Sequence, residues 1–204
     1  MAILDRISSI LSHPKLYLAY QTVVGGIEAR RKCVTQYVGS DRKQVVLDIG
    51  CGPGYALTWL VEPEYYGFDI SKPYIEHAKN RFGAQGQFFC QPFGEQFLDR
   101  IPPADVALLM GVVHHLDDNE TVALFRTIRR ALKSGGRLLT LDGCYRDGQS
   151  SIARWLLRSD RGGFVRDEIG YRTLAGSVFS DVRSTVREDF FRIPYTTIVM
   201  ECRP

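Results

Sequence analysis

From residue 45 onward, short apolar runs alternate with amphipathic stretches along the chain. Four of the five residues in Val45–Ile49 are apolar and three are β-branched, which is typical of a strand buried on both faces. Similar runs predict strands at 65–69, 86–90, 105–110 and 137–142. Apolar residues at helical spacing predict helices at 54–61, 73–82, 118–132 and 150–158. This alternation predicts an α/β fold, a parallel sheet with helices on both faces.

The two ends of the chain show other patterns. Apolar residues recur at helical spacing over 2–12, and helical patterns resume over 15–24 and 27–38. The β-rich runs Val182–Val186 and Thr196–Glu201 predict a closing antiparallel pair of strands. We therefore expect a single domain with three parts: a helical cap over 1–40, a core over 41–142, and a last segment over 143–204.

Composition narrows the class of protein. The 204 residues are 45% hydrophobic and 24% charged, and a net charge of +3 gives no argument for nucleic acid as a partner. The five cysteines form no C-x-x-C pair and no metal spacing with the four histidines, so we expect free thiols in a reducing compartment and no metal site. The sequence has no apolar run of about eighteen residues and no signal-peptide pattern, which favours the cytoplasm.

The strand at 45–49 runs into a loop with glycine at every second position, Gly50, Gly52 and Gly54. A strand followed by such a loop and a helix is predicted to offer backbone N–H groups and a helix N-terminus to a ligand. A phosphate loop would end in Gly-Lys-Ser/Thr, and a dinucleotide site would place glycine at position 55, which is Tyr55. Asp48 would repel a pyrophosphate, so a ligand with a cationic end is favoured.

The stretch Leu47–Gly54, read as D-x-G-x-G-x-G, resembles motif I of the class I S-adenosylmethionine-dependent methyltransferases. Asp69 lies nineteen residues after Gly50, at the end of the second predicted strand, where an acid binds ribose hydroxyls in doubly wound folds. Leu132–Leu138 resembles the late Leu-Lys-Pro-Gly-Gly motif, with Ser134 in place of proline. The resemblance implies a Rossmann-like, seven-stranded, mostly parallel sheet whose last strand is antiparallel.

The same resemblance implies S-adenosylmethionine as cofactor and a set of binding residues. Where the family commonly has an acid after the third strand, this chain has Gln91, whose amide oxygen can also accept a hydrogen bond. Phe93 either packs on the adenine or belongs to the core. The expected cofactor-binding residues are Asp48, Gly50, Cys51, Gly52, Gly54, Asp69, Ile70, Gln91, Pro92, Phe93, Met110 and Gly111.

Ala104–Leu116 resembles the fourth-strand motif of small-molecule methyltransferases, in which a strand runs into a hydrophobic-His-His-Leu turn. One histidine of His114 and His115 is a candidate general base, since imidazole titrates near neutral pH, and His114 is favoured for this role. The alternative is that the histidines are structural and hold the loop to the following helix, a role that suits His115 better.

Arginines and aromatic residues crowd the segment after the fifth predicted strand. Three interpretations remain open: a lid that binds an acceptor carboxylate or phosphate, an RNA contact, or a solvated face paired with Asp160, Asp167 and Glu168. The arginines concerned are Arg154, Arg158, Arg161, Arg166 and Arg172.

Taken together, these patterns predict methyl transfer from S-adenosylmethionine to a small-molecule acceptor at oxygen, nitrogen or carbon. The alternatives are an RNA- or protein-modifying methyltransferase and a non-catalytic S-adenosylmethionine-binding protein. Residues 110–113 lack the Asn/Asp-Pro-Pro-Tyr/Phe motif of amino-methylating DNA enzymes, and the chain lacks the Pro-Cys nucleophile of ring-carbon enzymes. No pattern fixes an oligomeric state.

Overall fold

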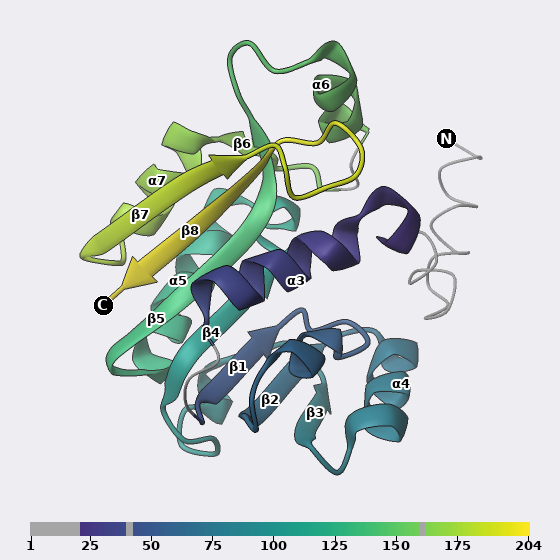
Figure 1. Cartoon of the computed structure of the whole chain (residues 1–204). Helices are drawn as coiled ribbons and strands as arrows, with labels where there is room; N and C mark the ends of the chain where they lie inside the picture. Colours follow the sequence, from purple (N-terminus) through teal and green to yellow (C-terminus); the bar gives the residue numbers. More distant parts are fainter. Residues whose placement is uncertain (1–20, 40–42, 160–161) are drawn as a thin grey trace.

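A computed structural model describes residues 21–39, 43–159 and 162–204, and it is built around one twisted sheet (Figure 1). Seven strands follow the order β3-β2-β1-β4-β5-β8-β7, and the short β6 pairs with β5 outside this path. β1 to β5 run parallel to their neighbours, and β8 is antiparallel to both β5 and β7. The strands are β1 Val45–Ile49, β2 Glu64–Asp69, β3 Gly86–Cys90, β4 Ala104–Met110, β5 Leu132–Tyr145, β6 Arg166–Asp167, β7 Asp181–Arg187 and β8 Thr197–Arg203.

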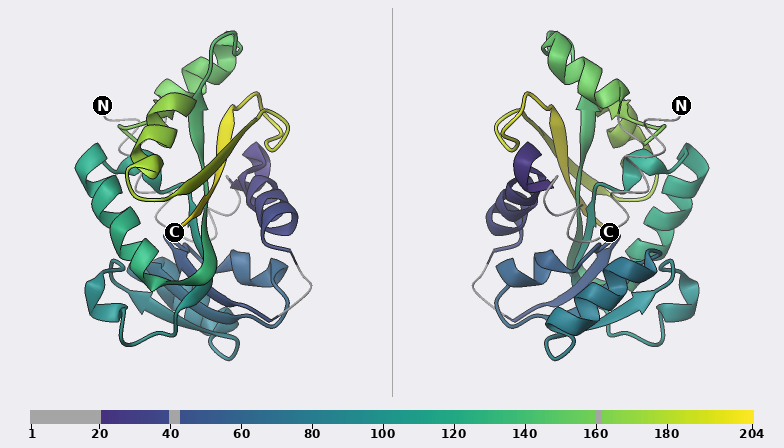
Figure 2. Two further views of the ribbon diagram at one scale, coloured as in Figure 1. Left: turned by 90° about the vertical axis from the view of Figure 1, so that its left-hand side faces the viewer. Right: turned by 90° about the vertical axis from the view of Figure 1, so that its right-hand side faces the viewer.

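Helices cover both faces of this sheet, as Figure 2 shows for α3 and α5. The α-helices are α3 Gly26–Tyr37, α4 Lys72–Phe82, α5 Asp118–Ala131, α6 Ser151–Arg158 and α7 Glu168–Gly176. Three short 3₁₀ helices are η1 Tyr55–Trp59, η2 Glu95–Phe97 and η3 Val113–His115. The predicted fold, a mostly parallel sheet with an antiparallel last strand, is confirmed.

The sheet separates two hydrophobic cores, because successive side chains of a strand point to opposite faces. In β1, Leu47 belongs to the core under α5 and α7, whereas Val46 belongs to the core under α3 and α4. By the same alternation Asp48 faces α3. The position of Asp48 beside α3 therefore follows from the alternation of side chains along β1.

The C-terminal part of the chain supports the start of α3. The amide of Arg192, in the loop between β7 and β8, donates to Val24 O at 3.3 Å, and a Cβ at Gly25 would lie 2.6 Å from that amide nitrogen. Lys32 Nζ donates to Asp189 O at 2.6 Å. α3 is therefore fixed by contacts from both the sheet and the β7–β8 loop.

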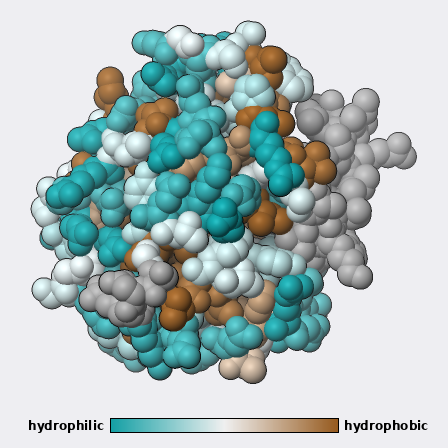
Figure 3. Space-filling view, viewed as in Figure 1, coloured by the Kyte–Doolittle hydropathy of each residue, from teal (hydrophilic) through white to brown (hydrophobic). Residues whose placement is uncertain are grey.

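The surface is polar over much of the molecule. The face shown in Figure 3 is mostly hydrophilic, and its apolar side chains lie in small separate areas. Within residues 21–39, 43–159 and 162–204, no helix combines the length and the apolar character that a membrane crossing requires.

The structure differs from the predicted elements in several places, and the short β6, η2 and η3 were not predicted. The predicted helix at 54–61 is only the 3₁₀ helix η1. The hydroxyl of Thr58 donates a hydrogen bond to Tyr55 O at 2.7 Å and so competes with the backbone donor of an α-helix. Pro63 also disfavours the helical conformation at residue 62. α7 was not predicted, although its N-cap Asp167 accepts from Gly170 N. β5 extends beyond the predicted 137–142 at both ends. The helix predicted at 2–12 and most of that at 15–24 lie outside the described residues.

Helix α5 begins with a reciprocal cap, which its sequence dictates. The Asp117 carboxylate accepts from Glu120 N at 2.8 Å, and the Glu120 carboxylate accepts from Asp117 N at 3.0 Å. These two hydrogen bonds satisfy amides that have no partner within the helix. The cap also fixes where the preceding η3 turn ends.

We expect Asp117→Ala to lower the free energy of unfolding by about 1 kcal/mol, the typical cost of losing a helix cap. Urea unfolding followed by circular dichroism measures this change. Asn119→Ala, in the exposed first turn of the same helix, is the matched control. Identical unfolding midpoints for Asp117→Ala and wild type would show that the cap contributes nothing.

Candidate functional site

Parallel strands bring the loops that follow them to one edge of the sheet, where ligands bind in open α/β folds. At this edge a cavity of about 40 Å³ lies between the glycine loop and α3. Its walls include Arg30 from α3, Asp48 from β1, Met110 from β4 and the loop residues Gly50 and Gly52. The cavity is lined by four of the five residues predicted from motif I, Asp48, Gly50, Cys51 and Gly52, but not by Gly54.

The three loop glycines serve different purposes, although all have left-handed φ angles of 73°, 54° and 81°. A Cβ at Gly50 would lie 2.4 Å from the Val112 side chain, and one at Gly54 would lie 3.0 Å from Phe88. A Cβ at Gly52 would meet nothing within 4 Å among the described residues. Gly50 and Gly54 thus permit packing, whereas Gly52 leaves open space beside the cavity.

The backbone amides of this loop are not available to a ligand, contrary to the prediction. The amides of Gly50 and Cys51 both donate to Phe68 O at 2.8 and 3.0 Å, and the amide of Gly52 donates to Asp69 at 2.9 Å. The element that follows is the short η1, not an α-helix. The loop is therefore no anion cradle, which agrees with the exclusion of a phosphate ligand.

Asp48 is a buried carboxylate with one oxygen unused. Its side chain is 1% exposed, and Tyr65, from the neighbouring β2, donates its hydroxyl to Oδ2 at 2.5 Å. No described residue gives Oδ1 a hydrogen bond. Burial raises the pKa of Asp48 to about 7. A cationic ligand group in the cavity would satisfy Oδ1 and stabilise the charged form.

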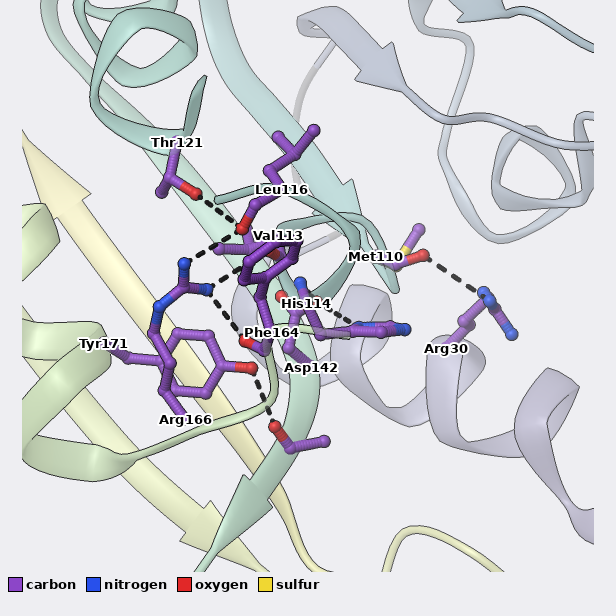
Figure 4. Close-up of polar contacts among 11 residues, drawn as sticks. Arg30, Met110, Val113, His114, Leu116, Thr121, Asp142, Phe164, Arg166 and Tyr171 are labelled. Carbon is purple, nitrogen blue, oxygen red and sulfur yellow. Dashed lines mark hydrogen bonds and ion pairs between the residues drawn. The ribbon is translucent and has the colours of Figure 1, made fainter. Parts of the chain in front are cut away.

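Arg30 provides the opposite charge, and the sequence did not single it out. It donates to Met110 O at 3.4 Å and to the Gln21 side chain at 2.9 Å, as Figure 4 shows for the first contact. Gly111 leaves room for it, because a Cβ there would lie 3.2 Å from the guanidinium. One signal was present: Arg30 adjoins Ala29 and lies one turn before the buried Val34, at the edge of the buried helix face.

The second expected group of cofactor residues lies around the end of β2. Asp69 accepts from Gly52 N at 2.9 Å and from Ser71 N at 2.8 Å, so its carboxylate connects the glycine loop to the start of α4. Burial raises the pKa of Asp69, while these two hydrogen bonds act in the opposite direction. Ile70 is 79% exposed, and Gln91 and Pro92 are exposed beyond it.

Two further expected cofactor residues differ in position: Phe93 lies in the core, whereas Cys51 is among the residues that line the cavity. Phe93 is 7% exposed and packs edge-on against Phe68 at a centroid distance of 5.2 Å, so its ring belongs to the core and offers no face to adenine. The Cys51 side chain is buried, with its thiol 3.5 Å from Gly52 O, and burial raises its pKa well above the usual value. The thiol of Cys51 is therefore protonated, and its amide is already bonded to Phe68 O.

The structure distinguishes the two adjacent histidines. His114 is 7% exposed, and its Nδ1 lies 2.8 Å from Oδ1 of Asp142 at the end of β5, with the His114 amide 3.2 Å from the same oxygen (Figure 4). His115 is exposed and its ring tilts against that of His114 at 4.2 Å. With Asp142 ionised, Nδ1 of His114 carries the proton, which leaves the lone pair on Nε2. Asp142 was missed because nothing local links it to His114.

Two arginines of this segment, Arg166 and Arg172, bond within the protein, whereas the exposed Arg154 and Arg158 leave the three interpretations open. Arg166 pairs with Asp118 at 2.6 Å, and its side chain is only 12% exposed. Arg172 donates to Ser184 Oγ at 2.9 Å, and Asp167 caps α7. Arg154 and Arg158 are exposed on α6, and Arg161 lies outside the described residues. In the described part of the chain, no group of three or more His, Cys, Asp or Glu side chains is placed to hold a metal ion.

Comparisons with known proteins agree with this geometry. A family model described as "Methyltransferase domain" matches residues 47–138. The phenazine O-methyltransferase PhzM of Lysobacter antibioticus is 28% identical over 119 residues, which are 55% of this chain and 35% of PhzM. The aclacinomycin 10-hydroxylase RdmB of Streptomyces purpurascens is 30% identical over 178 residues, which are 78% of this chain and 47% of RdmB. The chain thus spans less than half the length of these relatives.

The fold is shared with solved structures. Human N-acetylserotonin methyltransferase in complex with S-adenosylmethionine superposes with a TM-score of 0.64 at 19% identity, over 94% of this chain and 55% of that protein. Residues 47–138 thus match a methyltransferase domain, and the chain has the fold of the class I S-adenosylmethionine-dependent methyltransferases.

Proposed function

We propose that this protein binds S-adenosylmethionine and transfers its methyl group to a hydroxyl group of a small aromatic acceptor. The observation that carries the proposal is the His114–Asp142 pair, 2.8 Å apart, at the sheet edge that also holds the glycine loop. A hydroxyl must lose a proton as it attacks, and a base beside the cofactor loop meets that need. PhzM is named a phenazine O-methyltransferase, and phenazine is a small aromatic compound.

The cavity residues fit the amino-acid end of this cofactor. Asp48, with its unbonded Oδ1, suits the ammonium group, and Arg30, across the cavity, suits the carboxylate. Gly52 leaves space for close approach, and Asp69 at the end of β2 suits the ribose hydroxyls. The sulfonium supplies an activated methyl group and leaves as a neutral thioether.

The reaction needs only positioning and one proton acceptor from the protein. The acceptor oxygen forms a bond to the methyl carbon, and the electron pair of the broken C–S bond stays on sulfur. The hydroxyl proton moves to Nε2 of His114, while Asp142 holds Nδ1–H and stabilises the imidazolium that forms.

The relative RdmB is named a hydroxylase, so membership in the family does not by itself fix the reaction. Binding and transfer are therefore measured separately. Calorimetry with S-adenosylhomocysteine tests the cofactor site, and release of S-adenosylhomocysteine across a panel of aromatic hydroxy compounds tests transfer. Tight binding without transfer to any hydroxyl would favour a non-catalytic or different role.

Gly52→Val should abolish S-adenosylhomocysteine binding in a folded protein, because its side chain would enter the open space beside the cavity. Gly135→Val is the matched control, since Gly135 also has a left-handed φ and open space around its Cβ, but belongs to the other end of β5. Calorimetry on both variants, with circular dichroism for the fold, makes the comparison. Equal losses of affinity in both would mean that backbone strain, not the cavity, is responsible.

Asp48→Asn should weaken S-adenosylmethionine binding and remove its pH dependence. In the wild type we expect affinity to rise as pH increases through about 7, because the carboxylate that faces the cationic end becomes ionised there. Calorimetry at pH 6 and pH 8 measures the difference. If the affinity of the wild type for S-adenosylmethionine is the same at both pH values, Asp48 does not bind the ammonium group.

The same substitution should stabilise the free protein above neutral pH. The folded pKa of Asp48, about 7, lies above the ordinary value of 3.8, so the native state holds a proton that the unfolded state has lost, and stability falls as pH rises between these values. Asp48→Asn avoids this loss, which amounts to up to about 4 kcal/mol at pH 8. Urea unfolding at pH 5 and pH 8 would show a larger gain at the higher pH, because the loss in the wild type grows until the pH reaches about 7.

His114→Ala should lower turnover by about 10²-fold or more with a hydroxyl acceptor, the scale of general base catalysis. The affinity for S-adenosylhomocysteine should stay within about twofold, because the lost interaction belongs to the transfer step. His115→Ala, whose side chain is exposed, is the neighbouring control. Full turnover in His114→Ala would leave a mechanism of proximity alone.

A further inference from the structure

His114 lies in a turn that has few hydrogen bonds of its own. The turn η3 closes with His115 N donating to Val112 O and Leu116 N donating to Val113 O, at 3.0 and 3.1 Å. A 3₁₀ turn of this length has poor hydrogen-bond geometry and little intrinsic stability. The orientation of the His114 ring must therefore be fixed from outside the turn.

Asp142 of β5 bonds to both the ring and the amide of His114, and further outside contacts come from the segment that enters between α6 and α7. Phe164 N donates to His114 O at 3.0 Å. A Cβ at Gly162 would lie 2.0 Å from Cδ2 of His114, so the glycine backbone packs directly on the edge of the imidazole. These two contacts hold the backbone and the ring of the same residue.

Arg166 holds the turn on both sides of His114, as Figure 4 shows. Its Nη1 donates to Val113 O at 3.4 Å and to Phe164 O at 2.9 Å, and its Nη2 donates to Leu116 O at 2.9 Å. Nε and Nη2 also donate to Asp118 Oδ1 at 3.0 and 2.6 Å. All five N–H donors of the guanidinium are thus used inside the protein, so this arginine has no donor left for an acceptor anion.

The second member of the pair, Asp142, is held from the same side. The buried Tyr171 of α7 donates its hydroxyl to Gly143 O at 2.9 Å, immediately after Asp142. Arg166 itself pairs with Cys144 in the β5–β6 ladder, and its guanidinium lies 5.8 Å from the Tyr171 ring. One unit therefore contacts both the η3 turn, which carries His114, and the strand β5, which carries Asp142.

We propose that this unit, Gly162, Phe164, Arg166 and Tyr171, is a positioning clasp for the His114–Asp142 pair, with Arg166 as its central residue. The inference rests on the proposed function, since it assigns the clasp to a histidine that acts as base. Lysine cannot replace Arg166, because a single ammonium with three donors cannot span the Val113, Leu116 and Phe164 carbonyls together. A misplacement of about 1 Å can cost about 10²-fold in rate.

The first test compares two matched pairs of variants. Arg166→Lys is compared with Arg183→Lys, since Arg183 also forms an arginine–aspartate ion pair, with Asp181, but on the exposed strand β7. Gly162→Ala is compared with Gly163→Ala, because a Cβ at Gly163 would meet nothing within 4 Å. We expect Arg166→Lys and Gly162→Ala to lower kcat by between about tenfold and 10²-fold. The two controls should keep wild-type kcat, and all four should keep wild-type affinity for S-adenosylhomocysteine.

The double variants separate positioning from general damage. In a His114→Ala background, Arg166→Lys should cause no further loss of kcat, because a residue that acts through His114 has nothing left to position. A loss in that background as large as in the wild type would overturn the proposal. If Arg166→Lys does not fold, Tyr171→Phe takes its place, because it removes a single hydrogen bond to Gly143 O. Its loss of kcat is then compared between the wild-type and the His114→Ala background.

A measurement that needs no acceptor keeps the clasp distinguishable from the proposed function. The chain has four histidines, so its histidine ¹⁵N NMR spectrum is simple. The ring-nitrogen signals that disappear in His114→Ala are those of His114. We expect a protonated Nδ1 and an unprotonated Nε2 in wild type, and a mixture of tautomers in Arg166→Lys and Gly162→Ala. Unchanged His114 nitrogens in both variants would overturn the clasp, whereas wild-type protein that transfers no methyl group would overturn the proposed function alone.

Discussion

Burial of the central strands on both faces is the constraint on which the rest of the site depends. Since side chains alternate between two cores, residues at the carboxyl ends of β1, β4 and β5 are divided between two sides of the sheet. Asp48 and Met110 face α3, and Asp142 faces the side of α5 and α7. The cavity and the proposed base thus lie on the two sides of the sheet edge, and they approach each other at Gly111, where a Cβ would lie 3.2 Å from Arg30 and 3.7 Å from Cε1 of His114.

Both sides of the edge contain a buried carboxylate with an oxygen that no described residue satisfies, Oδ1 of Asp48 and Oδ2 of Asp142. Each carboxylate is held through its other oxygen, by Tyr65 and by His114 respectively. Unsatisfied buried oxygens are uncommon and cost stability, so they concentrate where a ligand or a reaction uses them. The two carboxylates differ in surroundings, because Asp48 faces the cavity and Asp142 faces an imidazole.

Local sequence predicted the elements and motifs whose signal lies within a few residues. The five parallel strands, α4, α5 and the position of Asp69 followed from apolar patterns and glycine spacing. Arg30, Asp142 and the role of Arg166 could not be predicted, because each depends on contacts with residues that are distant in the chain. The expectation of free loop amides failed for the same reason, since the carbonyl of Phe68 in β2 takes two of them. Phe93 went to the core because Phe68 and Phe97 surround it.

The attachment of α3 to the β7–β8 loop has a consequence for how such domains can be divided. The stretch that identifies the family, residues 47–138, contains the glycine loop but neither Arg30 nor Asp142, and α3 is supported by Arg192 and Asp189 near the C-terminus. The segment that is recognisable by sequence is therefore shorter than the segment that contains all the residues of the proposed site. A fragment cut at the borders of the recognisable stretch would retain the signature of the family, yet lose the helix that closes the cavity and the support of that helix.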